Sequence, residues 1–168
     1  AMKLASEAII SAATEAWLER AWIFRFPNVV GTPATHGVML DFVRKLKATP
    51  SQLTVLGDGT QQKAYLHVDD LVDAMLFITR HADEKINIYN IGPDDNGCSV
   101  RFIAEAAVAR VQPGARIIYG SEPRGWVGDV PKFSYSIDKL AALGWKSPHS
   151  SQQAVIKAMN EIATQEGV

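Results

Sequence analysis

The sequence predicts an α/β fold in which short strands and longer helices alternate. Runs of β-branched and aromatic residues are separated by runs with helical periodicity from residue 21 onward. The apolar share is 47%, which is enough for a packed core. No G-x-G-x-x-G dinucleotide fingerprint occurs, and fewer strands are predicted than a complete doubly wound sheet contains. We therefore expect residues 1–168 to form one α/β portion of a larger protein.

The predicted helices combine strong helix formers with apolar residues spaced three or four apart. The first helix has an alanine-rich face, which suits close packing against a sheet. Ser99 is expected to cap the fourth helix, and Ser150 or Ser151 the last, while Gly144 should end the fifth. The helices are expected at 3–19, 38–47, 71–81, 100–111, 137–143 and 152–165.

The predicted strands are short apolar or alternating segments bounded by turn residues. Two segments should be irregular. One is 26–37, where Pro27, Gly31 and Pro33 favour a loop long enough to serve a site, and the other is 121–136. The strands are expected at 21–25, 53–57, 63–68, 86–92 and 115–120.

Composition excludes several classes of protein. The net charge is −1, and no run of Lys or Arg exceeds two residues, so a nucleic-acid partner is not expected. No stretch approaches the roughly 20 apolar residues of a membrane span. Cys98 is the only cysteine, which excludes an internal disulfide and a Cys-rich zinc site. We expect a soluble, cytoplasmic protein.

His67, Asp69 and Asp70 are residue types that bind metals. Their spacing does not place three ligands together, and acidic residues at a helix start are favoured by the helix dipole. We therefore expect no metal site, and we expect the two aspartates to open the helix that follows.

Four segments carry motifs in a fixed order. They are KLASEAIISA from Lys3, RFPNVVG from Arg25, GDGTQQKAYLHVDD from Gly57, and YNIG from Tyr89, followed by Ser99-Val100 and by RGWVGDV from Arg124. Together these segments resemble the extended short-chain dehydrogenase/reductase superfamily. Its NAD-dependent nucleotide-sugar epimerases and dehydratases, of the UDP-glucose 4-epimerase type, are the most similar group.

The resemblance implies that this chain is the C-terminal half of such an enzyme. It would contain the last strands of a parallel, Rossmann-type sheet and a small substrate-binding α/β subdomain. The N-terminal dinucleotide-binding half would lie outside the chain. Lys3 would be the lysine of the family's Y-x-x-x-K pair, near the nicotinamide ribose, where its ammonium lowers the pKa of the catalytic tyrosine. That tyrosine would lie before residue 1.

The same resemblance implies a set of substrate-binding residues. Asn28 and Arg124 would contact the phosphates, and Trp126 would cover a sugar or base face. Lys63 stands where the family usually has an arginine, so it would act on the diphosphate as a point charge without a bidentate fork. Pro27 lies at a position associated with the nicotinamide, and it lacks a backbone N–H to donate there. His36 and Gly37 are expected near the substrate pocket.

The function expected from the resemblance is nucleotide-sugar epimerisation through transient oxidation by NAD. The partner would be a nucleoside-diphosphate sugar, and this chain alone should be inactive. Two alternatives stay open. The first is a dehydratase or reductase of the same superfamily. The second is a non-catalytic module that binds nucleotide sugars or oligomerises, because the first helix exposes an apolar stripe that favours homo-oligomers.

Overall fold

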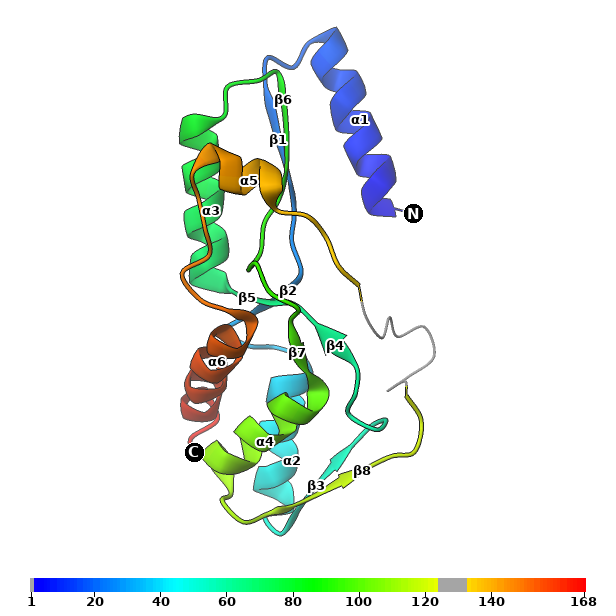
Figure 1. The fold of residues 1–168 in the computed structure, drawn as a ribbon, viewed down its shortest axis with the longest axis vertical. Coiled ribbons are helices and arrows are strands. Elements are labelled where there is room, and N and C mark those ends of the chain that lie inside the picture. Colours follow the sequence, from blue (N-terminus) through cyan, green and yellow to red (C-terminus); the bar gives the residue numbers. More distant parts are fainter. Residues whose placement is uncertain (1, 124–132) are drawn as a thin grey trace.

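The computed structural model describes residues 2–123 and 133–168 and confirms the α/β class. The helices are α1 (Met2–Ala16), α2 (Val38–Ala48), α3 (Val68–His81), α4 (Val100–Val111), α5 (Asp138–Leu143) and α6 (Ser151–Gln165). The strands are β1 (Ala21–Arg25), β2 (Asn28–Val30), β3 (Gln52–Val55), β4 (Gln62–Lys63), β5 (Tyr65–His67), β6 (Ile86–Asn90), β7 (Cys98–Ser99) and β8 (Arg116–Tyr119). Figure 1 shows an elongated molecule with α1, α3 and α5 at one end and α2, α4 and α6 at the other.

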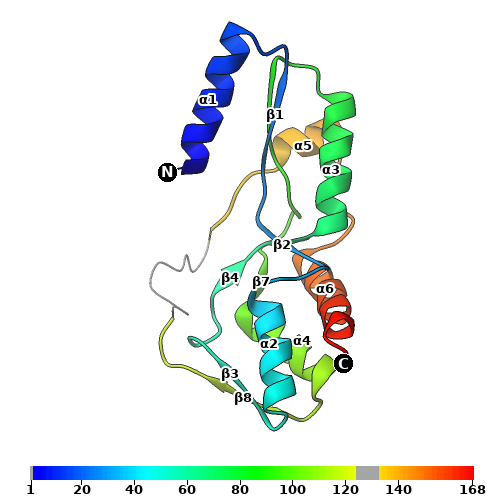
Figure 2. The ribbon, with the colours of Figure 1, turned by 180° about the vertical axis from the view of Figure 1, so that it is seen from behind.

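The described strands pair two by two. β1 lies parallel to β6, β2 to β5, and β3 to β8, whereas β4 runs antiparallel to β7. Within the β1–β6 pair, Ile23 stands opposite Ile88. α1 lies on one side of this pair, and α3 and α5 lie on the other (Figure 2). Helices on both sides of parallel strands are the arrangement that crossover connections produce.

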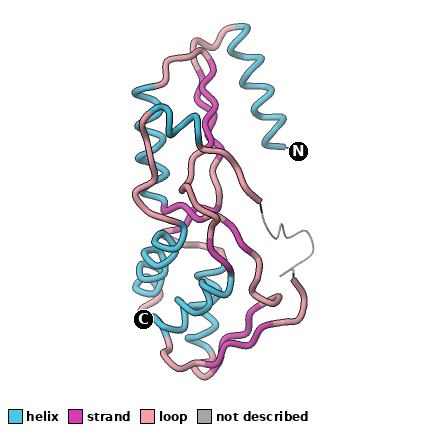
Figure 3. The backbone as a smooth tube through the Cα atoms, viewed as in Figure 1, coloured by secondary structure: helices cyan, strands magenta, loops and turns pink. Residues whose placement is uncertain are grey.

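Two hydrophobic cores fill the two ends of the molecule. The first lies among α2, α4, α6 and β3, and it includes the fully buried Val43 and Leu46. The second lies among α3, α5, β5 and β6, and Trp145 closes it. Figure 3 shows the backbone passing back and forth between these two ends. The strands where the ends meet, β2 and β5, therefore determine how the two cores sit together.

Helix capping follows the sequence predictions at three positions. Ser99 Oγ accepts the backbone N–H of Phe102 at 3.2 Å at the start of α4. Ser150, rather than Ser151, caps α6, and it forms a reciprocal capping box with Gln153. Gly144 ends α5 with φ +106°, the left-handed conformation that favours glycine.

The predicted strand 63–68 is two strands in the structure. β4 pairs with β7 and β5 pairs with β2, so the segment changes partner at Ala64. Gly97 permits the β4–β7 approach, because a Cβ there would lie 2.2 Å from the Lys63 carbonyl oxygen. Neither β2 nor β7 was predicted. β2 lies inside the segment expected to be a loop, and both are only two or three residues long.

The predicted starts and ends of the first and third helices also differ from the structure. α1 ends at Ala16, three residues before the predicted end. α3 begins at Val68, because the Nδ1 of His67 accepts the Asp69 backbone N–H at 3.2 Å and caps the helix. Asp69 and Asp70 lie in the first turn, where carboxylates are favourable next to the helix dipole. In the described part of the chain, no helix has the length and hydropathy needed to cross a membrane.

The first core can be tested through Leu46, which is fully buried. Leu46→Ala should lower the free energy of unfolding by about 2–5 kcal/mol, because it removes buried methyl groups and leaves a cavity. Ile156 on α6 is 48% exposed, so Ile156→Ala should cost about 1 kcal/mol or less. Equilibrium urea unfolding measures both losses. Equal losses in the two variants would contradict the core described above.

Candidate functional site

A cavity of about 860 Å³ lies beside the junction of the two ends of the molecule. Its walls come from β2, the 31–37 loop, the first turns of α2, the end of β3, and the segment that contains β4 and β5. Most of these side chains are apolar, and a few polar groups are set among them. Small-molecule sites typically have volumes of about 300–1,000 Å³ and this kind of lining. The cavity is therefore the candidate site.

Three of the residues singled out in the sequence line this cavity. Asn28 is exposed on β2, and the parallel register places it opposite Tyr65 of β5. Lys63 is half-buried on β4, which the antiparallel pairing with Cys98 holds in place. Pro27 precedes β2 and lies on the same wall. Residues from two different strand pairs thus meet at one cavity.

The 31–37 loop covers one side of the cavity. It leaves β2 through Gly31, whose φ is +139° and where a Cβ would lie 2.7 Å from Val68 Cγ1. It ends at Gly37, which has φ +104° and precedes α2. His36 and Gly37 both line the cavity, and their expected place near a substrate stays a prediction. The glycine at residue 31 lets the loop turn closely over the start of α3.

The remaining predicted site residues lie elsewhere. Lys3 is exposed on α1, which contributes no residue to the described lining of the cavity. Leu4 and Ile9 on the same helix are 69% and 70% exposed, which is the feature behind the expected self-association. Arg124 and Trp126 lie outside the described residues, so their expected contact with the phosphates and sugar stays a prediction.

Besides Thr32, Thr35 and Tyr65, three more polar residues of the lining have no role predicted from the sequence. Asp41 and Lys45, one turn apart on α2, form an ion pair at 2.8 Å. Gln61 precedes β4 and is 2% exposed, and among the described residues neither polar atom of its amide has a hydrogen-bond partner. A buried polar group without a partner costs about 1–3 kcal/mol. Gln61 lies inside the GDGTQQKAYLHVDD motif, but no sequence pattern shows that its amide lacks a partner among the described residues.

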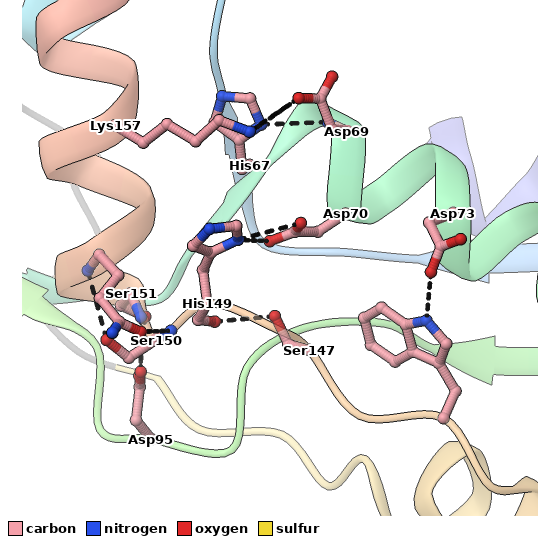
Figure 4. A network of polar contacts seen from close by, with 12 residues as sticks. His67, Asp69, Asp70, Asp73, Asp95, Ser147, His149, Ser150, Ser151 and Lys157 are labelled. Carbon is pink, nitrogen blue, oxygen red and sulfur yellow. Dashed lines mark hydrogen bonds and ion pairs between the residues drawn. The ribbon is translucent and has the colours of Figure 1, made fainter.

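Behind the cavity, a buried histidine of β5 forms polar contacts with α6. His67 is 1% exposed and lies opposite Val30 of β2. Its Nε2 lies 3.0 Å from Glu161 of α6, and its Nδ1 lies 3.3 Å from the Lys157 ammonium. Lys157 also donates to Asp69 at 2.8 Å (Figure 4), and this contact lowers the pKa of the Asp69 carboxyl. The cluster is a set of ion pairs and hydrogen bonds between elements.

A second polar cluster in Figure 4 fixes the start of α6. His149 Nδ1 lies 2.9 Å from the buried Asp70. Ser151 is fully buried, donates its hydroxyl to Asp95 at 2.7 Å, and accepts the Tyr65 N–H at 3.1 Å. In the chain as described, no three His, Cys, Asp or Glu side chains are grouped so as to hold a metal ion. These contacts hold β5 in position behind the cavity.

Parallel strand pairs are flanked by helices, and a cavity of the size typical of small-molecule sites lies where strands from different pairs meet, so the chain is an α/β protein with a candidate ligand site. Residues 1–92 match the NAD dependent epimerase/dehydratase family. The chain belongs to this family. Two residues of the cavity lining, the half-buried Lys63 and the exposed Asn28, lie within the matched region.

Solved structures of the family share this fold. A UDP-galactose 4-epimerase is 30% identical with a TM-score of 0.82, over 96% of this chain and 52% of the other. The UDP-glucose 4-epimerase of Thermotoga maritima, solved with UDP-glucose, is 20% identical with a TM-score of 0.79, over 97% and 52%. A dTDP-glucose 4,6-dehydratase of Bacillus anthracis, solved with NAD, is 16% identical with a TM-score of 0.75, over 95% and 50%.

A curated relative is also about twice as long as this chain. An uncharacterized protein of Schizosaccharomyces pombe is 23% identical over 96% of this chain and 52% of its own length. The chain therefore spans about half the length of the relatives that it matches.

The β4–β7 pair that holds Lys63 can be probed through Cys98. The residue is 2% exposed, and burial, with a smaller effect from Asp95, raises the pKa of its thiol to about 12. At pH 8 the thiol is therefore protonated, and only the thiolate reacts with disulfide reagents. We expect Cys98 to react with Ellman's reagent at least on the order of a hundredfold more slowly in the folded chain than in guanidinium. Equal rates in the two conditions would show that this pair is open in solution.

Proposed function

We propose that the cavity binds the nucleoside diphosphate part of a nucleotide sugar. On this proposal the chain supplies the substrate-binding portion of an NAD-dependent nucleotide-sugar epimerase. The observation that carries it is the meeting of Asn28 and Lys63, from different strand pairs, at one largely apolar cavity. A diphosphate needs a cation and N–H donors, which the lysine ammonium and the asparagine amide supply. The apolar walls suit a nucleoside.

The relatives support this assignment of the ligand class. The Thermotoga maritima epimerase was solved with UDP-glucose, and a Bacillus cereus UDP-glucuronic acid 4-epimerase was solved with a UDP sugar and NAD. The sugars and the reactions in the names of these enzymes differ, but each name contains a nucleoside-diphosphate sugar. The proposal that the cavity binds a nucleoside diphosphate would therefore hold for any of these reactions, whereas the proposal of epimerisation requires one particular reaction.

NAD is the cofactor that the family's name implies. The sequence has no G-x-G-x-x-G turn, and the predicted cofactor contacts, Lys3 and Pro27, lie on separate elements, one exposed and one at the cavity. These residues do not build a dinucleotide site by themselves, so no chemical step through NAD is derived for this chain. Its proposed share of the reaction is to bind and orient the nucleotide sugar.

Two alternative functions would use the same cavity. A dehydratase or reductase of the family would use the same nucleoside diphosphate site with different groups around the sugar. A non-catalytic module would bind nucleotide sugars without converting them. Binding to the isolated chain is common to all of these, whereas turnover separates an active enzyme from a module.

The binding proposal can be tested with Lys63→Met. Removing the ammonium should weaken UDP-glucose binding by about ten- to a hundredfold, since a hydrogen bond to a charged group is lost. Isothermal titration calorimetry of the 168-residue chain measures this change. Lys146→Met is the matched control, because Lys146 is exposed and is not among the lining residues. The proposal is wrong if the unmodified chain does not bind UDP-glucose, or if both variants bind it equally well.

The catalytic part of the proposal predicts binding without conversion. We expect no UDP-galactose when this chain is incubated with UDP-glucose and NAD⁺, because nothing in its sequence matches the fingerprint that holds the dinucleotide. Proton NMR of the anomeric signals follows the reaction directly. UDP-galactose formed in proportion to the protein concentration would contradict the expected inactivity, and it would also exclude the non-catalytic module.

A further inference from the structure

The side-chain amide of Gln165, the last residue of α6, is bonded to the middle of the 31–37 loop. Its Nε2 donates to the Ala34 carbonyl oxygen at 2.9 Å, and its Oε1 accepts the Ala34 backbone N–H at 2.8 Å. One side chain thus pairs with both polar backbone groups of one residue, as a neighbouring strand would. The two residues are far apart in the sequence, so the contact joins distant segments of the chain.

The loop that Gln165 contacts has conformational freedom at both of its ends. Gly31 and Gly37 have φ values of +139° and +104°, in the region that favours glycine. Between them every side chain is exposed except that of Ala34, which is half-buried. All seven residues of the loop line the cavity. Because packing orders such a segment only weakly, a contact at its centre has a large share in setting its position.

The end of α6 is itself firmly held, so it can act as a fixed point for the loop. Ile162, almost one turn before Gln165, is buried in the first core. The Glu166 carboxylate accepts a hydrogen bond from Arg44 of α2 at 2.9 Å, and the Glu166 carbonyl oxygen accepts one from Lys47 of the same helix. α2 begins directly after the loop, and Figure 1 shows α2 and α6 at the same end of the molecule.

Gln165 can act on a ligand only through this loop. It is not among the described residues that line the cavity, whereas Ile162 of the same helix is. When a loop takes up its binding conformation for only part of the time, the apparent affinity falls by that fraction. A contact that holds the loop in place before the ligand arrives removes this loss.

We propose that Gln165 is a positioning residue of the cavity, and that its two hydrogen bonds to Ala34 hold the 31–37 loop in the conformation that binds the ligand. This inference rests on the proposed function, since the ligand is taken to be a nucleotide sugar. It adds a residue outside the cavity on which the affinity of the cavity depends.

The first test compares Gln165→Met with Gln152→Met in the 168-residue chain. Methionine has a similar size but no N–H to donate, so the paired contact with Ala34 is lost. Gln165→Met should bind UDP-glucose about three- to tenfold more weakly in isothermal titration calorimetry, because the lost hydrogen bonds are exposed and modest. Amide hydrogen exchange at Ala34 should also become faster. Gln152 is exposed in the first turn of α6, so its variant should match wild type in both measurements.

Gln165→Glu tests the donor and acceptor pair itself. At pH 7.5 the carboxylate has no proton for the Ala34 carbonyl oxygen, so the affinity should again fall about three- to tenfold. A protonated carboxyl presents an O–H donor beside a C=O acceptor, as the amide does. At pH 4, below the ordinary glutamate pKa of about 4.3, the affinity should recover to within about twofold of wild type. Wild type is measured at each pH, because His36, Glu166 and the ligand titrate in both proteins, while the two cations of α2 stay charged.

Several results would overturn the positioning role and leave the proposed function intact. These are a wild-type affinity in Gln165→Met, an equal loss in Gln152→Met, and a loss in Gln165→Glu that is the same at both pH values. A lower melting temperature of Gln165→Met with unchanged affinity would assign the amide to the fold alone. Wild type that does not bind UDP-glucose would overturn the proposed function and this inference together.

Discussion

β5 is buried on both of its faces, and the arrangement of the site depends on this strand. Tyr65 packs into the first core, whereas its neighbour Leu66 packs into the second. Successive side chains of a strand point to opposite faces, so three residues join the two cores. A slip of one residue would exchange the faces and place the His67 imidazole on the wrong side. β2 takes its register from β5, and β4 leads directly into it, so the positions of Asn28 and Lys63 follow.

Much of the fold was predictable because local signals determine it. The strand at 21–25, the helix at 100–111 with its Ser99 cap, and the end of α5 at Gly144 all follow from periodicity and capping chemistry. The missed features depend on partners distant in the sequence. β7 exists because Gly97 lets a turn approach β4, and the pattern of residues 63–68 does not show that the strand changes partner. Caps made by unusual groups, such as the His67 imidazole, are also invisible to propensity.

The candidate site was predictable to a similar extent. Motif resemblance identified Asn28, Lys63 and Pro27, and the structure brings all three to one cavity. It could not identify Gln61, because burial and the lack of a hydrogen-bond partner within the described part of the chain are properties of three-dimensional packing. The cavity lining thus includes residues that the motif resemblance singles out and a residue that only the three-dimensional structure distinguishes.

The alternation of the chain between the two cores has a mechanical consequence. In the described residues, the first core draws on 30–65, 98–119 and 155–168, and the second on 22–24, 66–91 and 140–145. Two lobes that open around a ligand usually swing about a few pivot residues. Here several segments of the chain cross from one core to the other, so a change at a single pivot residue cannot separate the two cores. A ligand bound as proposed would therefore have to enter and leave past short segments at the rim, and the 31–37 loop is one such segment of the lining.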